Sequence, residues 1–304
     1  MKRRRDYVSF IGASLLGIAV FAITHAASAQ EKTLRTGTNA GIVRQIDHVL
    51  FITPGGRGLV TLLTDTFGLP VVFPQPGESW TASTGIGVGN VTLEVFHRPP
   101  TPAGETPVAG RISSLALQPT DLETALMELK LRGIGHDETP PRERKPGEPL
   151  PRWKTVGLER FGHGLFLIQY VFDMDARRSR FEKILRDRKG GPLGIVRVKE
   201  VVIATDQPDQ VRPQWIALLG PVVSAKDDLW SVGDGPAIRL VRTGDPHQST
   251  LVVEVMDLSR ATKALLRLNV PALSTKHEIR IDPAALLGLR LILQKSGREK
   301  RRSK

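Results

Sequence analysis

The fold of this chain can be worked out from the stretch Ile46-Asp47-His48-Val49-Leu50-Phe51-Ile52, whose β-branched and aromatic residues are typical of a strand. A helix is predicted over 57–67, because Leu59, Leu62, Leu63 and Phe67 recur at helical spacing. Gly68-Leu69-Pro70 ends that helix, and further strands are predicted from 71, over 81–87 and over 91–96. The first segment therefore has the order strand, helix, strand, strand, strand, written βαβββ.

The same order is predicted three more times, which indicates an internal repeat. The second unit begins with a strand over 112–117, and Thr120 is the expected N-cap of its helix. The third unit begins over 196–203 and the fourth over 250–255. We predict an α+β fold of four tandem βαβββ units, arranged as two halves over 44–175 and 194–295 and joined by a charged linker helix over 176–193.

Composition excludes several classes of function. The 304 residues carry a formal net charge of +12, but the basic residues gather at the two ends, which together account for about eight of these charges. Basic segments of this kind lack the interleaved aromatic residues of a nucleic-acid surface, so we expect no nucleic-acid partner. There are no cysteines, which excludes disulfides, thiolate metal sites and cysteine nucleophiles.

The N-terminus has the features of an export signal. Residues 2–5 are basic, 8–24 are apolar, and Ala27-Ser28-Ala29 has the small-x-small pattern of a cleavage site. Arg4-Arg5 also resembles a twin-arginine signal. We expect a cleaved signal over 1–29, a flexible tether over 30–43, a basic tail over 296–304, and a periplasmic or extracellular protein that does not stay in a membrane. The alternative is an uncleaved N-terminal anchor.

The repeated unit resembles the vicinal oxygen chelate superfamily, which includes glyoxalase I, extradiol dioxygenases and bleomycin-resistance proteins. The matching short segments in the first half are Ile46-Asp47-His48-Val49, Phe67-Gly68-Leu69, Thr84-Gly85 and Leu93-Glu94. The second half matches in the pattern of strands and helices, with fewer matching segments. The resemblance implies that paired units close into cupped half-barrel sheets, each holding a divalent metal and a small molecule.

The resemblance also implies which residues would hold the metal. Family ligands come from the first and last strands of each unit, and the matching positions in the first half are His48, Glu94 and Gln169. The fourth position falls on Ser113 or Ser114, which are poor ligands. Imidazole and carboxylate together suit Zn, Mn, Ni or Fe. Because side chains alternate along a strand, Asp47 is expected on the opposite face from His48.

Other polar and aromatic residues are candidates for the substrate pocket of the first half: Trp80, His97, His163 and Tyr170. In the second half, Glu200 and Arg239 take the positions equivalent to His48 and Glu94. A carboxylate with an arginine makes an ion pair or an anion clamp, not a metal site.

Three hypotheses for function follow. The first is an exported glyoxalase-like lyase or isomerase, in which a divalent metal acts as a Lewis acid on a small oxygenated molecule. The second is a metal-free protein that binds or sequesters a small molecule in the same cup. The third is a structural envelope protein whose cups have lost their function.

Overall fold

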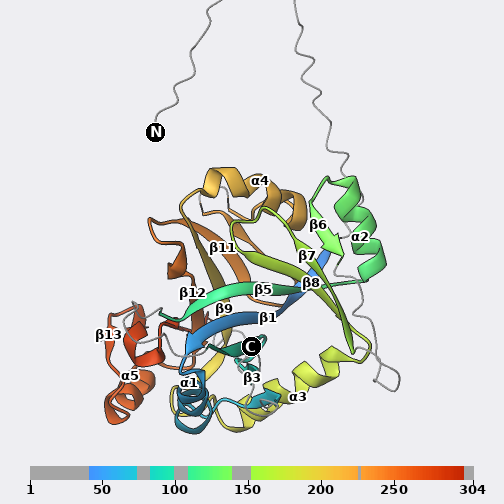
Figure 1. The fold of residues 1–304 in the computed structure, drawn as a ribbon. Helices are drawn as coiled ribbons and strands as arrows, with labels where there is room; N and C mark the ends of the chain where they lie inside the picture. Colours follow the sequence, from blue (N-terminus) through green and yellow to red (C-terminus); the bar gives the residue numbers. More distant parts are fainter. Residues whose placement is uncertain (1–40, 74–82, 99–108, 139–151, 225–226, 298–304) are drawn as a thin grey trace, which may run out of the picture. The chain divides into compact units, whose positions relative to one another are not determined.

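The computed structural model describes residues 41–73, 83–98, 109–138, 152–224 and 227–297 (Figure 1). The expected signal segment, the tether and most of the basic tail lie outside these residues. No helix within the described ranges is both long and apolar enough to cross a membrane.

The first half forms an eight-stranded mixed sheet in the order β2-β3-β4-β1-β5-β8-β7-β6. Its strands are β1 (Val43–Pro54), β2 (Val71–Phe73), β3 (Ser83–Gly87), β4 (Thr92–Arg98), β5 (Arg111–Pro119), β6 (His136–Glu138), β7 (Trp153–Leu158) and β8 (Gly164–Tyr170). β1 and β5 pair antiparallel at the centre, and each also pairs in parallel with the last strand of its own unit, β4 or β8 (Figure 1). Along the chain, the elements of this half follow the predicted βαβββ order twice, with β6 as a strand that the sequence did not indicate.

The second half forms a seven-stranded sheet in the order β10-β11-β9-β12-β15-β14-β13. Its strands are β9 (Ile195–Thr205), β10 (Leu229–Trp230), β11 (Ala237–Arg242), β12 (Thr250–Val255), β13 (Ala272–Ser274), β14 (Glu278–Ile281) and β15 (Arg290–Lys295). Between helix α4 (Pro208–Leu219) and β11 the described residues form only β10 and an isolated bridge from Ser224 to Leu229. The fourfold repeat as a whole therefore stays a prediction.

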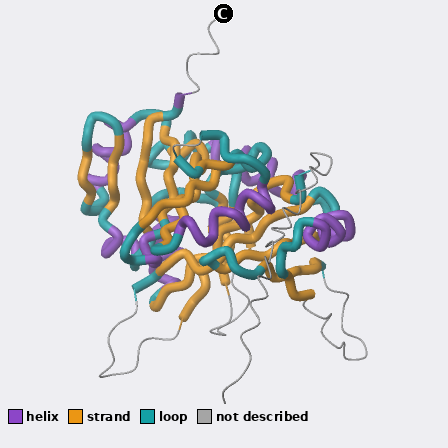
Figure 2. Tube along the Cα trace, turned by 90° about the horizontal axis from the view of Figure 1, so that it is seen from above, coloured by secondary structure: helices purple, strands orange, loops and turns teal. Residues whose placement is uncertain are grey.

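Helices lie against both sheets (Figure 2). They are α1 (Gly56–Thr61), continued by a π-helical turn at Leu62–Thr66, α2 (Leu122–Leu131), α3 (Met174–Asp187), α4 (Pro208–Leu219) and α5 (Leu258–Arg267), with 3-10 turns at Pro246–Gln248 and Pro283–Leu286. The N-cap of α2 is Asp121, which accepts a hydrogen bond from the Thr124 N–H, so the expectation of Thr120 was wrong by one residue. Either side chain suits the position, and only the backbone geometry selects Asp121.

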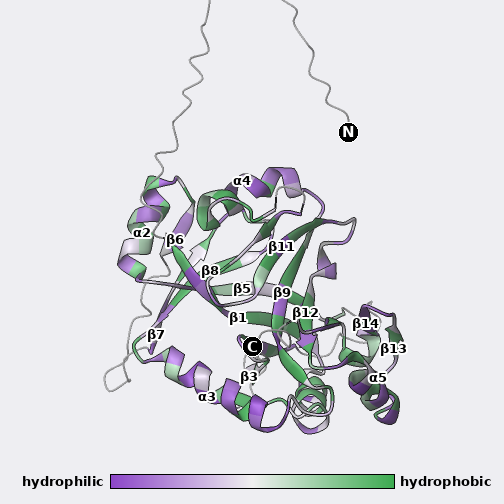
Figure 3. Cartoon of the chain, turned by 180° about the vertical axis from the view of Figure 1, so that it is seen from behind, coloured by the Kyte–Doolittle hydropathy of each residue, from purple (hydrophilic) through white to green (hydrophobic). Residues whose placement is uncertain are grey.

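Burial alternates along the strands because helices cover one face of each sheet. In β4 the side chains of Leu93 and Val95 are buried, whereas Glu94 and Phe96 are partly exposed. The central strands are largely hydrophobic and much of α3 is hydrophilic (Figure 3). We call the partly exposed face of the first sheet, which carries His48, Glu94, Ser114 and Phe166, the first cup. The corresponding face of the second sheet, which carries Glu200, Thr250 and Ile292, is the second cup.

Candidate functional site

His48 is the centre of the first cup, and both of its ring nitrogens face carboxylates. Its Nε2 lies 3.0 Å from Oε2 of Glu94, and its Nδ1 lies 2.6 Å from Oδ2 of Asp47. Parallel pairing of β1 with β4 sets His48 beside Thr92, so Glu94, two residues further, projects from the same face. The convergence of His48 and Glu94 predicted from the sequence is therefore present in the structure.

Asp47 lies on the same side as His48, so the expectation that it faces away was wrong. The pairing of β1 with β5 moves from Ile46–Leu117 to His48–Ala116, which leaves Asp47 as an extra residue without a partner. Such a β-bulge interrupts the alternation of side chains and turns the extra residue towards its neighbour. The bulge thus gives His48 its second carboxylate.

Further side chains complete the hydrogen bonds of the two carboxylates. The Tyr170 hydroxyl donates to Oδ2 of Asp47 at 3.0 Å, and Nη2 of Arg178, from α3, lies 3.4 Å from Oδ1. The Ser83 hydroxyl donates to Oε1 of Glu94 at 2.5 Å. Both carboxylates are therefore bound by donors from separate elements, which fixes their orientation.

This environment keeps the imidazole protonated. Burial alone would lower the pKa of His48, but hydrogen bonds and charge from Asp47 and Glu94 outweigh burial and raise this pKa to about 9. Burial, followed by the charge of Asp47, raises the pKa of Tyr170 well above its usual value. At neutral pH the cup thus holds an imidazolium between two carboxylates, with Tyr170 as a neutral donor.

Gln169 does not join this group, which corrects its predicted place as a third ligand. Its Oε1 accepts a hydrogen bond of 2.7 Å from the backbone N–H of Leu122 at the start of α2. The strand register shows why: His48–Thr92 in β1–β4 corresponds to Ser114–Gly164 in β5–β8, so the residue equivalent to Glu94 is Phe166. The Phe166 ring stands edge-on to His48, with centroids 5.8 Å apart.

The residues present do not fit a complete metal site. Four positions match the ligand positions of the family that the sequence resembles; two of them hold Ser114 and Phe166, and only His48 and Glu94 have suitable donors. A catalytic zinc-type site uses three protein ligands. Within the described ranges, no group of three or more His, Asp or Glu side chains is arranged to hold a metal ion. Asp47 on Nδ1 does resemble the outer carboxylate that orients a metal-binding imidazole, but the inner set is incomplete.

The other predicted pocket residues lie in different places. Trp80 is outside the described residues. His97 projects from the helix-covered face of β4, where a Cβ added to Gly56 would lie 2.5 Å from its Nδ1. Burial and the charge of Arg57 lower the pKa of His97. Burial, then the charge of Arg111, lowers the pKa of His163 to about 4. Of the three candidates within the described ranges, only Tyr170 contacts the His48 group, through Asp47.

In the second cup, Glu200 and Arg239 form the ion pair that was one of the two alternatives predicted from the sequence. Nε of Arg239 lies 2.8 Å from Oε2 of Glu200, and Nη1 lies 3.6 Å from Asp227. Although burial opposes ionisation, the hydrogen bond and charge of Arg239 hold the pKa of Glu200 below its usual value. The carboxylate and the guanidinium are both bound to other groups of the protein, so this ion pair is a structural contact and not an anion site.

Sequence reasoning missed Arg178, Ser83 and Phe166 at the first cup. Arg178 lies in the segment interpreted as a linker, and its contact with Asp47 spans 131 positions of the chain. The strand that holds Phe166 was predicted from the sequence, but Gln169, three residues further along the same strand, was the residue predicted to face the cup. Choosing between them required the pairing of β8 with β5, which a single strand does not contain.

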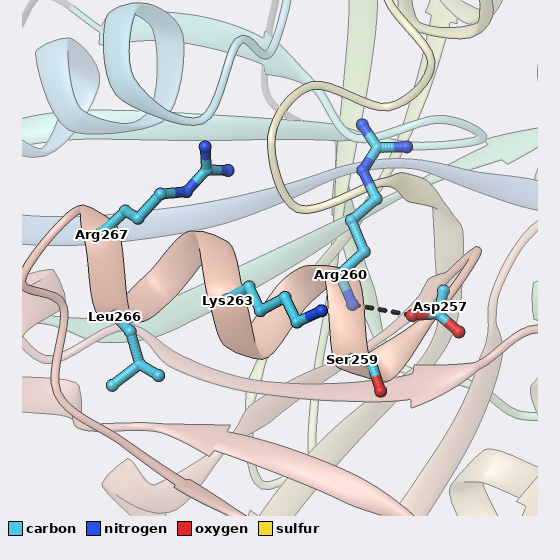
Figure 4. A pocket seen from close by; sticks show the side chains of 6 residues that line it. All are labelled: Asp257, Ser259, Arg260, Lys263, Leu266 and Arg267. Carbon is cyan, nitrogen blue, oxygen red and sulfur yellow. Dashed lines mark hydrogen bonds between the residues drawn. The ribbon is translucent and has the colours of Figure 1, made fainter.

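A separate hollow of about 720 Å³ lies along α5 and is lined by Asp257, Ser259, Arg260, Lys263, Leu266 and Arg267 (Figure 4). Asp257 caps the helix by accepting from the Arg260 N–H at 2.7 Å. The Arg260 guanidinium donates to the backbone oxygens of Gly191 and Pro192. The contacts of Asp257 and Arg260 thus hold the start of α5 in place.

Comparison with solved structures places this architecture. No family model matches the chain, and no curated protein matches it in sequence. An E323L mutant of homoprotocatechuate 2,3-dioxygenase from Brevibacterium fuscum superimposes with a TM-score of 0.56 at 11% identity, covering 84% of this chain and 72% of that one. The 2,3-dioxygenase LapB from Pseudomonas sp. KL28 gives a TM-score of 0.56 at 14% identity, covering 85% and 94%. The chain therefore has the vicinal oxygen chelate fold.

Proposed function

We propose that this protein binds a small oxygenated molecule in the first cup without a resident metal, and that it does so outside the cytoplasm. The location rests on the export signal predicted from the sequence. The binding site rests on one observation: Phe166 and Ser114 stand where two of the four metal ligands of this fold would be, beside an intact His48–Glu94 pair.

The electrostatics favour a ligand that donates hydrogen bonds. Both N–H groups of the His48 imidazolium are directed at carboxylates, so little donor capacity is left for a bound anion. Glu94 keeps free lone pairs on oxygens that each accept one hydrogen bond, and its side chain is 14% exposed. A hydroxyl of the ligand would donate to Glu94 while its apolar part packs against Phe166. The ligand class is therefore a small hydroxylated molecule with an apolar portion.

Catechol is a suitable probe, because structures of two variants of the B. fuscum dioxygenase contain HPCA. We expect saturable binding of catechol by calorimetry, unchanged by EDTA, and much weaker binding of 1,2-dimethoxybenzene, which has no hydroxyl donor. Glu94→Ala should weaken binding at least tenfold, which equals about 1.4 kcal/mol. His48→Ala should do the same, while His247→Gln, at an exposed position in the second half, is the matched control.

Two results would reject this proposal. If EDTA abolishes binding and Zn, Mn, Ni or Fe restores it, the metal-dependent lyase or isomerase predicted from the sequence is the better interpretation. If the folded wild type binds neither catechol nor HPCA, the proposed ligand class is wrong.

Restoring the missing ligands tests the observation itself. The double substitution Ser114→His and Phe166→Glu places an imidazole and a carboxylate at positions matching His48 and Glu94. We expect the double variant to bind one Zn or Mn ion per chain and the wild type to bind none, measured by metal analysis after dialysis. Gln169→Glu, whose side chain lies at the start of α2, should bind no metal. A wild type that retains stoichiometric metal would contradict the argument.

A further inference from the structure

A hollow of about 550 Å³ opens on the second cup, away from the site proposed above. It lies over β12, β13, β14 and β15, of which β12, β13 and β14 are labelled in Figure 3. The pairings Thr250–Arg290, Arg280–Ile292 and Leu273–Arg280 set these five residues on one face of the sheet. All five line the hollow, whose volume suits a small-molecule ligand.

Two arginines line this hollow, and within the described ranges only one of them is paired with a carboxylate. Nε of Arg280 donates to Oε1 of Glu278 at 2.6 Å. Asp282, at the same hollow, accepts from the Ala284 N–H at 2.9 Å and caps a 3-10 turn. By contrast, the side chain of Arg290 has no hydrogen bond or ion pair with any residue in the described ranges. Arg290 is thus the arginine of this hollow that has no carboxylate partner among the described residues, whereas Arg280 is paired with Glu278.

The remaining wall of the hollow is apolar and open. Leu273 is 76% exposed although its strand belongs to the sheet, and Ile292 is partly exposed. On the other face of β15, Leu291 and Leu293 are buried. Exposed apolar side chains beside an unpaired cation provide the two halves of a site for an amphipathic anion.

We propose that the second cup binds a monocarboxylate with a hydrocarbon body, with the carboxylate on Arg290 and the hydrocarbon against Leu273 and Ile292. A guanidinium offers two parallel N–H groups to a carboxylate, which favours this head group. Because the charge of Arg280 is paired with Glu278, Arg290 contributes one uncompensated positive charge, which favours a monoanion over a dianion such as a phosphate monoester. This site is independent of His48 and goes beyond the function proposed for the first cup.

Octanoate, octanol and acetate are the probes, titrated into the full chain by calorimetry. We expect one octanoate site per chain, with octanol and acetate at least tenfold weaker. Arg290→Gln and Leu273→Asp should each weaken octanoate at least tenfold, and Arg290→Lys should have an intermediate effect because it keeps the charge without the planar fork. Arg267→Gln, on α5 outside this hollow, is the matched control and should leave the affinity unchanged.

Circular dichroism establishes that each variant is folded before its affinity is compared. Equal affinity for octanol and octanoate would overturn the proposal, as would unchanged octanoate binding by folded Arg290→Gln. Absence of saturable octanoate binding by the wild type would overturn it as well. If Glu94→Gln, in the first cup, removes octanoate binding while Arg290→Gln does not, the ligand occupies the other half and the second-cup site is rejected.

Discussion

At the scale of single residues, the central feature is an imidazole bound on both sides by carboxylates. His48 has a side chain only 8% exposed, so its charge is tolerated only because Asp47 and Glu94 compensate it. Tyr170, Arg178 and Ser83 then hold those carboxylates in place. The cluster therefore stabilises the fold at the pH values where His48 carries its proton.

The pH dependence follows from the direction of the shift. The pKa of His48 is raised from 6.5 to about 9, so its contribution is complete below about pH 6.5 and is lost as the pH rises through about 9. We expect the free energy of unfolding, measured by urea denaturation, to fall between pH 6.5 and pH 9.5 in the wild type. This fall should exceed that of His48→Gln by on the order of 2 kcal/mol. His247→Gln should follow the wild type. Equal pH slopes for wild type and His48→Gln would contradict the charged-cluster description.

At the scale of elements, strand β8 serves two layers at once. Phe166 faces the cup, whereas Gln169, on the other face, supplies a hydrogen-bond acceptor to the first turn of α2. The first N–H groups of a helix have no partner within the helix, so this contact from a neighbouring strand stabilises the helix start. Gln169 is thus a capping residue and not a ligand.

Replacing Gln169 separates these two roles. Gln169→Leu leaves the Leu122 N–H without its acceptor, and we expect a loss of about 1 kcal/mol in the free energy of unfolding. Gln169→Glu keeps an acceptor oxygen and should stay close to the wild type. Catechol binding should be the same in all three proteins. If the Gln169→Leu protein has unchanged stability but no longer binds catechol, Gln169 belongs to the ligand site of the first cup and the capping role is wrong.

At the scale of the molecule, the two sheets belong to one compact unit, and aromatic packing joins them. Phe161, from the loop between β7 and β8, meets Trp215 of α4 edge-on, with centroids 5.2 Å apart. Nε1 of Trp215 donates to the Phe161 backbone oxygen at 3.3 Å. The loop after β3 adds a hydrogen bond from the Val198 N–H to Asn90. Because of these contacts, we expect the two halves to unfold together.

Phe161→Ala tests this coupling. Phe161 is 1% exposed, so its truncation should lower the free energy of unfolding by about 3–5 kcal/mol. Because the contact spans both halves, far-UV circular dichroism and tryptophan fluorescence should shift together in one transition. Phe172→Ala, at a partly exposed position, should have a smaller effect. Two separate transitions in the wild type would show that the halves unfold independently.

The sequence by itself determined the order of strands and helices in the first unit, over 46–96, because hydrophobic periodicity and Gly-Pro breaks are local properties. It also identified His48 and Glu94 as partners, since both lie in short segments that resemble the family. It identified the Glu200–Arg239 pair because these residues take the equivalent positions in the second half. Only the tertiary structure decided the side on which Asp47 lies and which residue of β8 faces the cup. Both depend on register between strands distant in the chain, where a bulge or a shift of one residue reverses the face of every side chain that follows.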